Sequence, residues 1–148
     1  MNRLEFRLDT ESVLPLLEHA RPLMEELGKE LATNNEPPEE DELMSDFWSK
    51  DLMNSQRKDV AAIAELFDDH FLETGRASVD AEDADLVLRG CTAMRLKLRG
   101  RSLGAFSDAA LESGELDIED FTQEQRIGYA AYALFASLQE LIISQLEL

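Results

Sequence analysis

Apolar side chains recur every three or four residues along most of this chain, which is the spacing of one buried face of an α-helix. The pattern is clearest over residues 12–32, 84–98 and 127–146. Thr122-Gln123-Glu124-Gln125 has the form of a capping box and marks the start of the last helix. A length of 148 residues suits one domain. We therefore predict an all-α fold, a single-domain helical bundle of about five helices over residues 1–148.

Four segments are less regular. Pro22 removes a hydrogen bond from the first helix while the apolar stripe continues in phase, which predicts a kinked helix. A polar stretch separates two apolar sets, which predicts two helices, over residues 43–52 and 60–71. Residues 34–42 carry two prolines and a run of acids, which predicts an exposed loop. Residues 103–120 predict a loop with one or two helical turns.

The first residues alternate instead of following the helical period. Leu4, Phe6 and Leu8 fall on one face and charged residues fall on the other, which predicts a short N-terminal β-strand. A lone strand needs a pairing partner, and residues 76–79 are the candidate. A two-stranded ribbon and an extended arm are both compatible with the sequence.

Acidic residues outnumber basic ones, with 32 Asp and Glu against 14 Lys and Arg, for a net charge of −18. Such a surface repels DNA, RNA and anionic lipid over most of its area. The single cysteine excludes an internal disulfide, and residues 1–7 lack the apolar core of a secretion signal, so we expect a cytoplasmic protein. Residues 127–146 are interrupted by Gln139, Glu140 and Gln145, so we expect them to pack against protein rather than cross a membrane.

The sequence holds little catalytic chemistry. His19, His70 and Cys91 stand too far apart for the usual spacing of zinc ligands, and the Walker and G-x-G-x-x-G phosphate motifs are absent. Ser102, within Gly100–Gly104, has no histidine near it in the sequence to act as its base. We therefore expect a protein that is not an enzyme, with no catalytic residues, no cofactor and no metal.

Three other sets of residues each have two interpretations. Asp68, Asp69 and His70 have the groups of a cation site or a general base, but we favour solvated aspartates with His70 extending an apolar stripe. Cys91 lies on the apolar face of its helix, so we favour a small core residue over a nucleophile. The adjacent aromatic residues at positions 47–48 suit an exposed contact site, but we favour a place in the core.

One segment differs sharply in charge from the rest. Residues 86–107 contain no acid, and the remainder of the chain carries a net charge of −23. The candidate binding residues are the five basic ones of this segment, Arg89, Arg95, Lys97, Arg99 and Arg101. Helical spacing places Arg95 beside the buried stripe and Lys97 and Arg101 toward the outside.

This basic segment also has two interpretations. We favour an internal counter-charge, in which its arginines pair with acids from residues 36–46 or 115–120. The alternative is a binding surface for a phosphate ligand, RNA or an acidic partner.

Short sequences spread along the chain resemble one bacterial family. They are Arg3-Leu4-Glu5-Phe6, the helix start over 79–85, Arg95-Leu96-Lys97-Leu98-Arg99, and Tyr132, Phe135 and Leu138 followed by Gln139-Glu140-Leu141. Together they resemble the actinobacterial family of unknown function DUF2017, although the family has an Asn-Asp pair where this chain has Ala93-Met94. The resemblance implies an α-helical cytoplasmic protein without an established activity, encoded near genes for proteolytic adaptors. It carries over no catalytic residues.

The sequence thus predicts a non-enzymatic cytoplasmic protein-interaction or regulatory module that docks on another protein or forms a homodimer. The alternative is an anion-binding, phosphate-binding or RNA-binding protein that uses residues 86–107. Neither DNA nor a membrane is an expected partner.

Overall fold

The computed structural model of the chain describes residues 3–32, 42–113 and 116–147. Within them lie four long helices, α1 (Thr10–Leu27), α2 (Glu42–Leu66), α4 (Ala84–Arg101) and α6 (Gln123–Leu146). The shorter elements are α3 (Asp69–Thr74), α5 (Asp108–Ser113), the strands β1 (Arg3–Arg7) and β2 (Arg76–Asp80), and the 3-10 turns η1 (Ala81–Asp83) and η2 (Ile118–Asp120). The prediction of an all-α fold of about five helices with a short N-terminal strand is confirmed. The predicted loop over residues 34–42 lies outside the described residues, except for Glu42.

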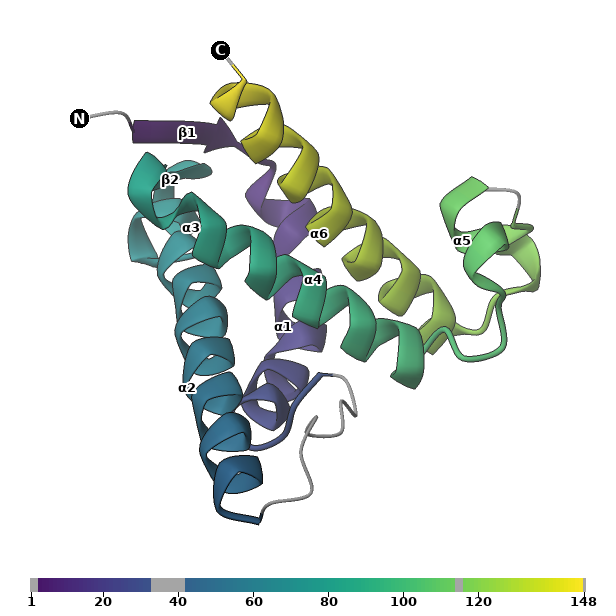
Figure 1. The fold of residues 1–148 in the computed structure, drawn as a ribbon. Helices are drawn as coiled ribbons and strands as arrows, with labels where there is room; N and C mark the ends of the chain where they lie inside the picture. Colours follow the sequence, from purple (N-terminus) through teal and green to yellow (C-terminus); the bar gives the residue numbers. More distant parts are fainter. Residues whose placement is uncertain (1–2, 33–41, 114–115, 148) are drawn as a thin grey trace.

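Helix α4 lies at the centre of the bundle, between α2 and α6, with α1 behind it (Figure 1). Its buried face is the predicted apolar stripe and carries Val87, Cys91, Met94 and Leu98. Helices α4 and α2 pack closely at Gly90, where a Cβ atom would lie 2.6 Å from the carbonyl oxygen of Asp59. No larger residue fits this crossing without moving one of the two helices.

Strands β1 and β2 form a two-stranded antiparallel ribbon in which Leu4 faces Val79 and Phe6 faces Ala77. Leu4 and Phe6 are buried, so the alternation in the sequence corresponds to an inner and an outer face. Of the two arrangements that the sequence leaves open, the structure has the ribbon. Gly75, with a φ angle of 75°, ends α3 and turns the chain into β2.

Helix α1 continues as one helix across Pro22, as the unbroken apolar stripe predicts. It ends at Leu27, whereas the sequence places its end near Ala32. The side chain of Gln56 in α2 pairs with backbone groups that the end of α1 leaves without partners. Its amide nitrogen donates to the carbonyls of Leu27 (2.6 Å) and Glu30 (2.7 Å), and its oxygen accepts from the N–H of Ala32 (2.9 Å).

The prediction of two helices over residues 43–52 and 60–71 is wrong. Helix α2 runs unbroken through the polar stretch, and the break comes later, at Asp68, which is the N-cap of α3. The polar stretch stays helical because Gln56 and Asp59 are buried and find partners on other elements. Polar residues here mark contacts between elements rather than a loop.

The predicted capping box opens α6. The hydroxyl of Thr122 accepts from the N–H of Gln125 (3.1 Å), and the Gln125 side chain accepts from the N–H of Thr122 (2.9 Å). The helix packs against α4 and α1 and buries Ala131, Phe135, Leu138 and Ile142. By length and composition alone α6 is apolar enough to cross a membrane, the one such helix among the described residues, and core helices of soluble proteins share this property.

Candidate functional site

Four of the five candidate basic residues of α4 form ion pairs with neighbouring elements. The pairs are Arg89 with Asp59, Lys97 with Glu26 and Glu30, Arg99 with Asp108, and Arg101 with Glu26. The acids therefore come from α1 and the turn after it, from α2 and from α5. In the described part of the chain neither Asp46 nor residues 116–120 supply a partner, and the side chains of residues 36–45 are not described. The basic segment thus has the geometry of an internal counter-charge, with other partners than those expected.

The ends of α1 and α4 are tied together by the cluster of Glu26, Glu30, Lys97 and Arg101. Lys97 is only 14% exposed because both glutamates cover it, so the prediction that it points outward is wrong. Arg101 is 51% exposed, as predicted. Its hydrogen bond to Glu26 (2.6 Å) lowers the pKa of that carboxyl group and raises the pKa of the guanidinium, so both stay charged.

Arg95 is the exception among the five, because it has no carboxylate partner among the described residues. Its Nη1 donates to Oε1 of Gln139 (2.8 Å), and its Nη2 donates to the hydroxyl of Tyr132 (3.1 Å). Its Cζ lies 4.8 Å from the centre of the Tyr132 ring. Its Nε is buried without a hydrogen-bond partner in the described ranges. Arg95 also lines a pocket of about 300 Å³ together with residues of α5 and α6.

An apolar groove of about 480 Å³ runs between α1 and α2. Its apolar lining includes Leu17, Met24, Val60, Ala64 and Phe67. Arg21, Glu25 and Arg57 are its charged lining residues. Arg57 donates to the carbonyl of Gly28 (2.9 Å), and neither arginine forms an ion pair within the described residues. The sequence gives no sign of this groove, because helical spacing alone does not distinguish a stripe that lines a groove from one that is fully covered by the core.

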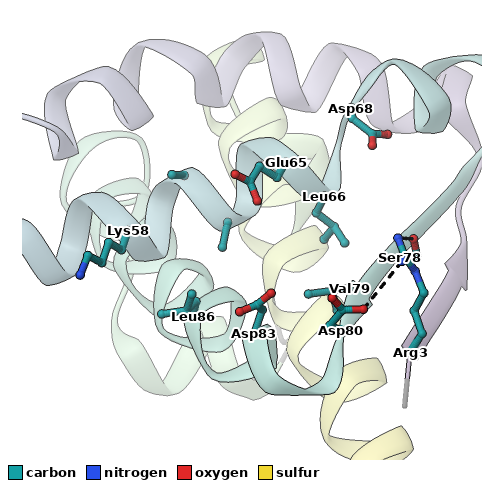
Figure 2. Close-up of a pocket in the computed structure, with 12 residues that line it drawn as sticks. Arg3, Lys58, Glu65, Leu66, Asp68, Ser78, Val79, Asp80, Asp83 and Leu86 are labelled. Atoms are coloured by element: carbon teal, nitrogen blue, oxygen red, sulfur yellow. Dashed lines mark hydrogen bonds and ion pairs between the residues drawn. The ribbon is translucent and has the colours of Figure 1, made fainter. Parts of the chain in front are cut away.

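Figure 2 shows a third feature, a polar pocket of about 470 Å³ where α2 meets β2 and η1. Glu65 and Asp83 lie on opposite sides of it, with Lys58 toward one end and Arg3 toward the other. Arg3 forms an ion pair with Asp80 (3.7 Å). Among the described residues no cluster of three or more His, Cys, Asp or Glu can hold a metal ion. The pocket is acidic, and nothing in it favours a particular ligand.

The Asp68, Asp69 and His70 set is not gathered into a site. Asp68 caps α3 by accepting from the backbone N–H of Phe71 (2.9 Å). Asp69 is exposed, as predicted, but His70 is exposed too, so the prediction that it extends the apolar stripe is wrong. The helix is interrupted between α2 and α3, at Asp68. His70 therefore does not continue the helical phase of α2, on which that prediction relied.

A core position is predicted for Cys91 and for the aromatic pair Phe47 and Trp48, and the structure agrees only for Cys91. Cys91 is fully buried, and this burial raises the pKa of its thiol to about 12 although the positive charge of Arg95 opposes the shift. The predicted core role of Cys91 is confirmed. Phe47 is 58% exposed and Trp48 is half-buried, so the predicted core role of this pair is wrong. Residues 46–55 of α2 contain no buried side chain.

The fold places Ser102 close to a histidine that is distant in sequence. A Cβ atom on Gly128 would lie 2.9 Å from Oγ of Ser102 and 3.9 Å from Nε2 of His19. Both polar atoms are buried without a hydrogen-bond partner in the part of the chain that the structure describes. Gly100–Gly104 has the letters of a G-x-S-x-G motif, but Ser102 ends a helix with φ −95° and ψ −22°, whereas a nucleophile elbow needs a strained strand-to-helix turn.

These features define an all-α domain built around an ion-paired central helix, with an apolar groove on α1 and α2 and with Arg95 as the one basic residue of that helix that lacks a counter-ion among the described residues. The chain belongs to the family described as Domain of unknown function (DUF2017), whose pattern matches residues 8–146. The resemblance seen in the sequence is therefore confirmed. Neither the curated proteins nor the solved structures contain a significant match to the chain.

Proposed function

We propose that this protein is a non-enzymatic, cytoplasmic protein-interaction module whose α1–α2 groove binds an amphipathic helix of a partner protein, with acidic residues beside the apolar stripe of that helix. The observation that carries the proposal is the groove itself. Val60, Ala64 and Phe67 of α2 line one side of it at the spacing of successive helical turns, and Leu17 and Met24 of α1, two turns apart, line the other side. Such a groove accepts the apolar anchors of a third helix at positions i, i+4 and i+7.

The charged residues at the groove indicate the sign of the charge that a partner helix carries. Arg21 and Arg57 outnumber Glu25, in a chain whose net charge is −18. Both arginines have free donors, because their described contacts include no carboxylate. A helix with glutamates flanking its apolar stripe meets these donors, whereas a lysine-flanked helix meets like charge.

A second copy of this chain is a poorer fit as the occupant. The large apolar side chains that α6 exposes are Leu141, Ile143 and Leu146. Ile143 and Leu146 share one face but span a single turn, and Leu141 points away from them, so α6 lacks an exposed stripe with i, i+4 and i+7 spacing.

Two designed helices test the proposal. They share the same leucine stripe and differ only in glutamate or lysine flanks, and their binding is measured by fluorescence anisotropy. We expect the glutamate-flanked helix to bind about fivefold more tightly, because two exposed ion pairs contribute roughly 1 kcal/mol in total. Ala64→Glu, which places a charge in the exposed apolar lining, should abolish binding, and Ala109→Glu on the exposed face of α5 is the matched control.

Several results would count against this function. Equal binding of both helices would contradict the expected preference for an acidic partner. Binding that Ala64→Glu leaves unchanged would show that the helix binds outside the α1–α2 groove. Light scattering adds a further check on the occupant. A dimer that Ala64→Glu dissociates would show that a second copy fills the groove and would overturn the choice of a partner helix.

A further inference from the structure

We infer that the pocket at Arg95 is a binding site for a carboxylate group, separate from the α1–α2 groove. The site joins residues of α4, α5 and α6, including Arg95, Leu96, Arg99, Glu112 and Tyr132. The inference goes beyond the proposed docking function, because it concerns a different surface and a different ligand chemistry.

Arg95 is held in place by neighbouring side chains that do not neutralise its charge. Gln139 receives a hydrogen bond from Arg95 through Oε1 and donates through Nε2 to the carbonyl of Leu88 (2.9 Å) and the hydroxyl of Thr92 (2.8 Å). These two bonds fix which end of the Gln139 amide faces the guanidinium. Tyr132 holds the other terminal nitrogen and also lies under the guanidinium. Both groups are neutral, so the charge of Arg95 remains available to an anion.

Arg95 differs from the other four basic residues of the 86–107 segment, which lie on the same helix. Arg89, Lys97, Arg99 and Arg101 are all paired with carboxylates, in a chain where acids are more than twice as numerous as basic residues. A partly buried arginine ordinarily has an acidic partner, because a desolvated charge is costly. The described residues supply none to Arg95, although its Nε also lacks an acceptor. A ligand carboxylate bound in the pocket that Arg95 lines supplies the missing charge.

The lining of the pocket favours one kind of anion. Arg99 is already paired with Asp108 (2.8 Å), and the carboxylate of Glu112 also lines the pocket. These acids repel a dianion more strongly than a monoanion. Leu96 and the ring of Tyr132 add an apolar wall, which suits a carboxylate on a short hydrocarbon stem. Such a group occurs in small carboxylic acids and in the glutamate side chain of a peptide.

A titration followed by NMR tests the site in the intact protein. The probes are isovalerate and the blocked dipeptide N-acetyl-leucyl-glutamate methylamide, with chloride at matched ionic strength and inorganic phosphate as comparisons. We expect a saturable shift of the Arg95 Nε–Hε resonance with both carboxylates. Tighter binding of isovalerate would indicate a small carboxylic acid as the ligand, and tighter binding of the dipeptide would indicate a glutamate side chain of a peptide. Equal shifts with chloride, no shift, or tighter binding of phosphate would overturn the assignment.

Variants sharpen the test. Arg95→Gln should weaken carboxylate binding at least about tenfold, whereas Arg76→Gln, an equal charge change on the exposed face of β2, should leave it unchanged. Glu112→Gln should tighten binding, because it removes a repulsive charge from the pocket lining. This variant changes an exposed residue, so it remains informative if Arg95→Gln does not fold. Unchanged or weaker binding in Glu112→Gln would contradict the inference.

Discussion

At the scale of single residues, the contact between Asp59 and Arg89 shows how burial and pairing compete. The Asp59 side chain is 9% exposed, and its two oxygens accept from Nε of Arg89 at 3.2 and 3.3 Å. Burial raises the pKa of Asp59 more than the charge of Arg89 lowers it. The ion pair therefore fixes the position of α4 against α2, beside the crossing at Gly90, but it contributes little to the net stability of the fold.

The raised pKa of Asp59 predicts the sign of a pH dependence. A carboxyl group with a higher pKa in the folded state than in the unfolded state binds more protons when folded. The stability that Asp59 contributes is therefore fully present at a pH below its pKa in the unfolded state. It declines as the pH rises through the higher pKa that Asp59 has in the folded state. The free energy of unfolding of the wild type, relative to that of Asp59→Asn, should fall from the acidic range toward neutral pH. Urea unfolding of both proteins at several pH values measures this difference, and a rise with pH would contradict it.

At the scale of elements, Gln56 joins α2 to the end of α1. A single buried amide satisfies the carbonyl of Leu27 at the end of α1 and one carbonyl and one N–H of the segment that follows. Helix ends leave such groups unpaired, and burying them without partners costs free energy. The position of α2 beside α1, and with it the α1–α2 groove, therefore depends on this side chain.

Replacing Gln56 with leucine keeps most of the volume and removes all three hydrogen bonds. We expect Gln56→Leu to lower the free energy of unfolding by about 2–3 kcal/mol, because buried polar groups lose their partners. Gln123→Leu, on the exposed first turn of α6, should change it by less than about 0.5 kcal/mol. Urea unfolding compares the two, and equal effects would show that the bonds of Gln56 do not support the fold.

The periodic elements are the part of this fold that the sequence predicts well. The stripes of α1, α4 and α6, the capping box at Thr122 and the strand at Leu4 and Phe6 all follow from local spacing. The errors occur where tertiary partners decide the outcome. The polar stretch of α2 stays helical because of residues on α1 and α4, and Lys97 is covered by glutamates that are distant in sequence.

The candidate sites were only partly predictable for the same reason. The sequence identifies the basic segment, but it does not show which arginine remains without an acid, since every partner lies on another element. The α1–α2 groove depends on how far two helices separate, and no periodicity encodes that distance. The proximity of Ser102 to His19 likewise had no signal in the sequence.

At the scale of the whole molecule, the net charge of −18 opposes the compact state. The ion pairs on α4 offset a part of this repulsion, but most acids among the described residues form no ion pair, and basic residues are fewer than half as numerous as acids. Salt screens attraction and repulsion alike, so the more numerous repulsive terms decide the sign.

We therefore expect the melting temperature to rise when sodium chloride is raised from about 0.02 M to about 0.5 M, a range over which the Debye length falls several-fold. Thermal unfolding followed by circular dichroism measures this effect. Sucrose, which is uncharged, is the control for general solute effects. A melting temperature that falls with salt would show that the ion pairs outweigh the repulsion.

The ribbon also bears on the order in which this protein can fold during its synthesis. Strand β1 pairs with residues 76–80, and the Gln145 side chain donates to the carbonyl of Glu5 (2.9 Å). Both partners leave the ribosome long after β1 itself. The apolar face of Leu4 and Phe6 therefore stays uncovered while α1, α2 and α3 emerge, and closing so long a loop makes the ribbon a late event. The arginines that alternate with these residues keep the waiting segment charged, which opposes premature association with other nascent chains.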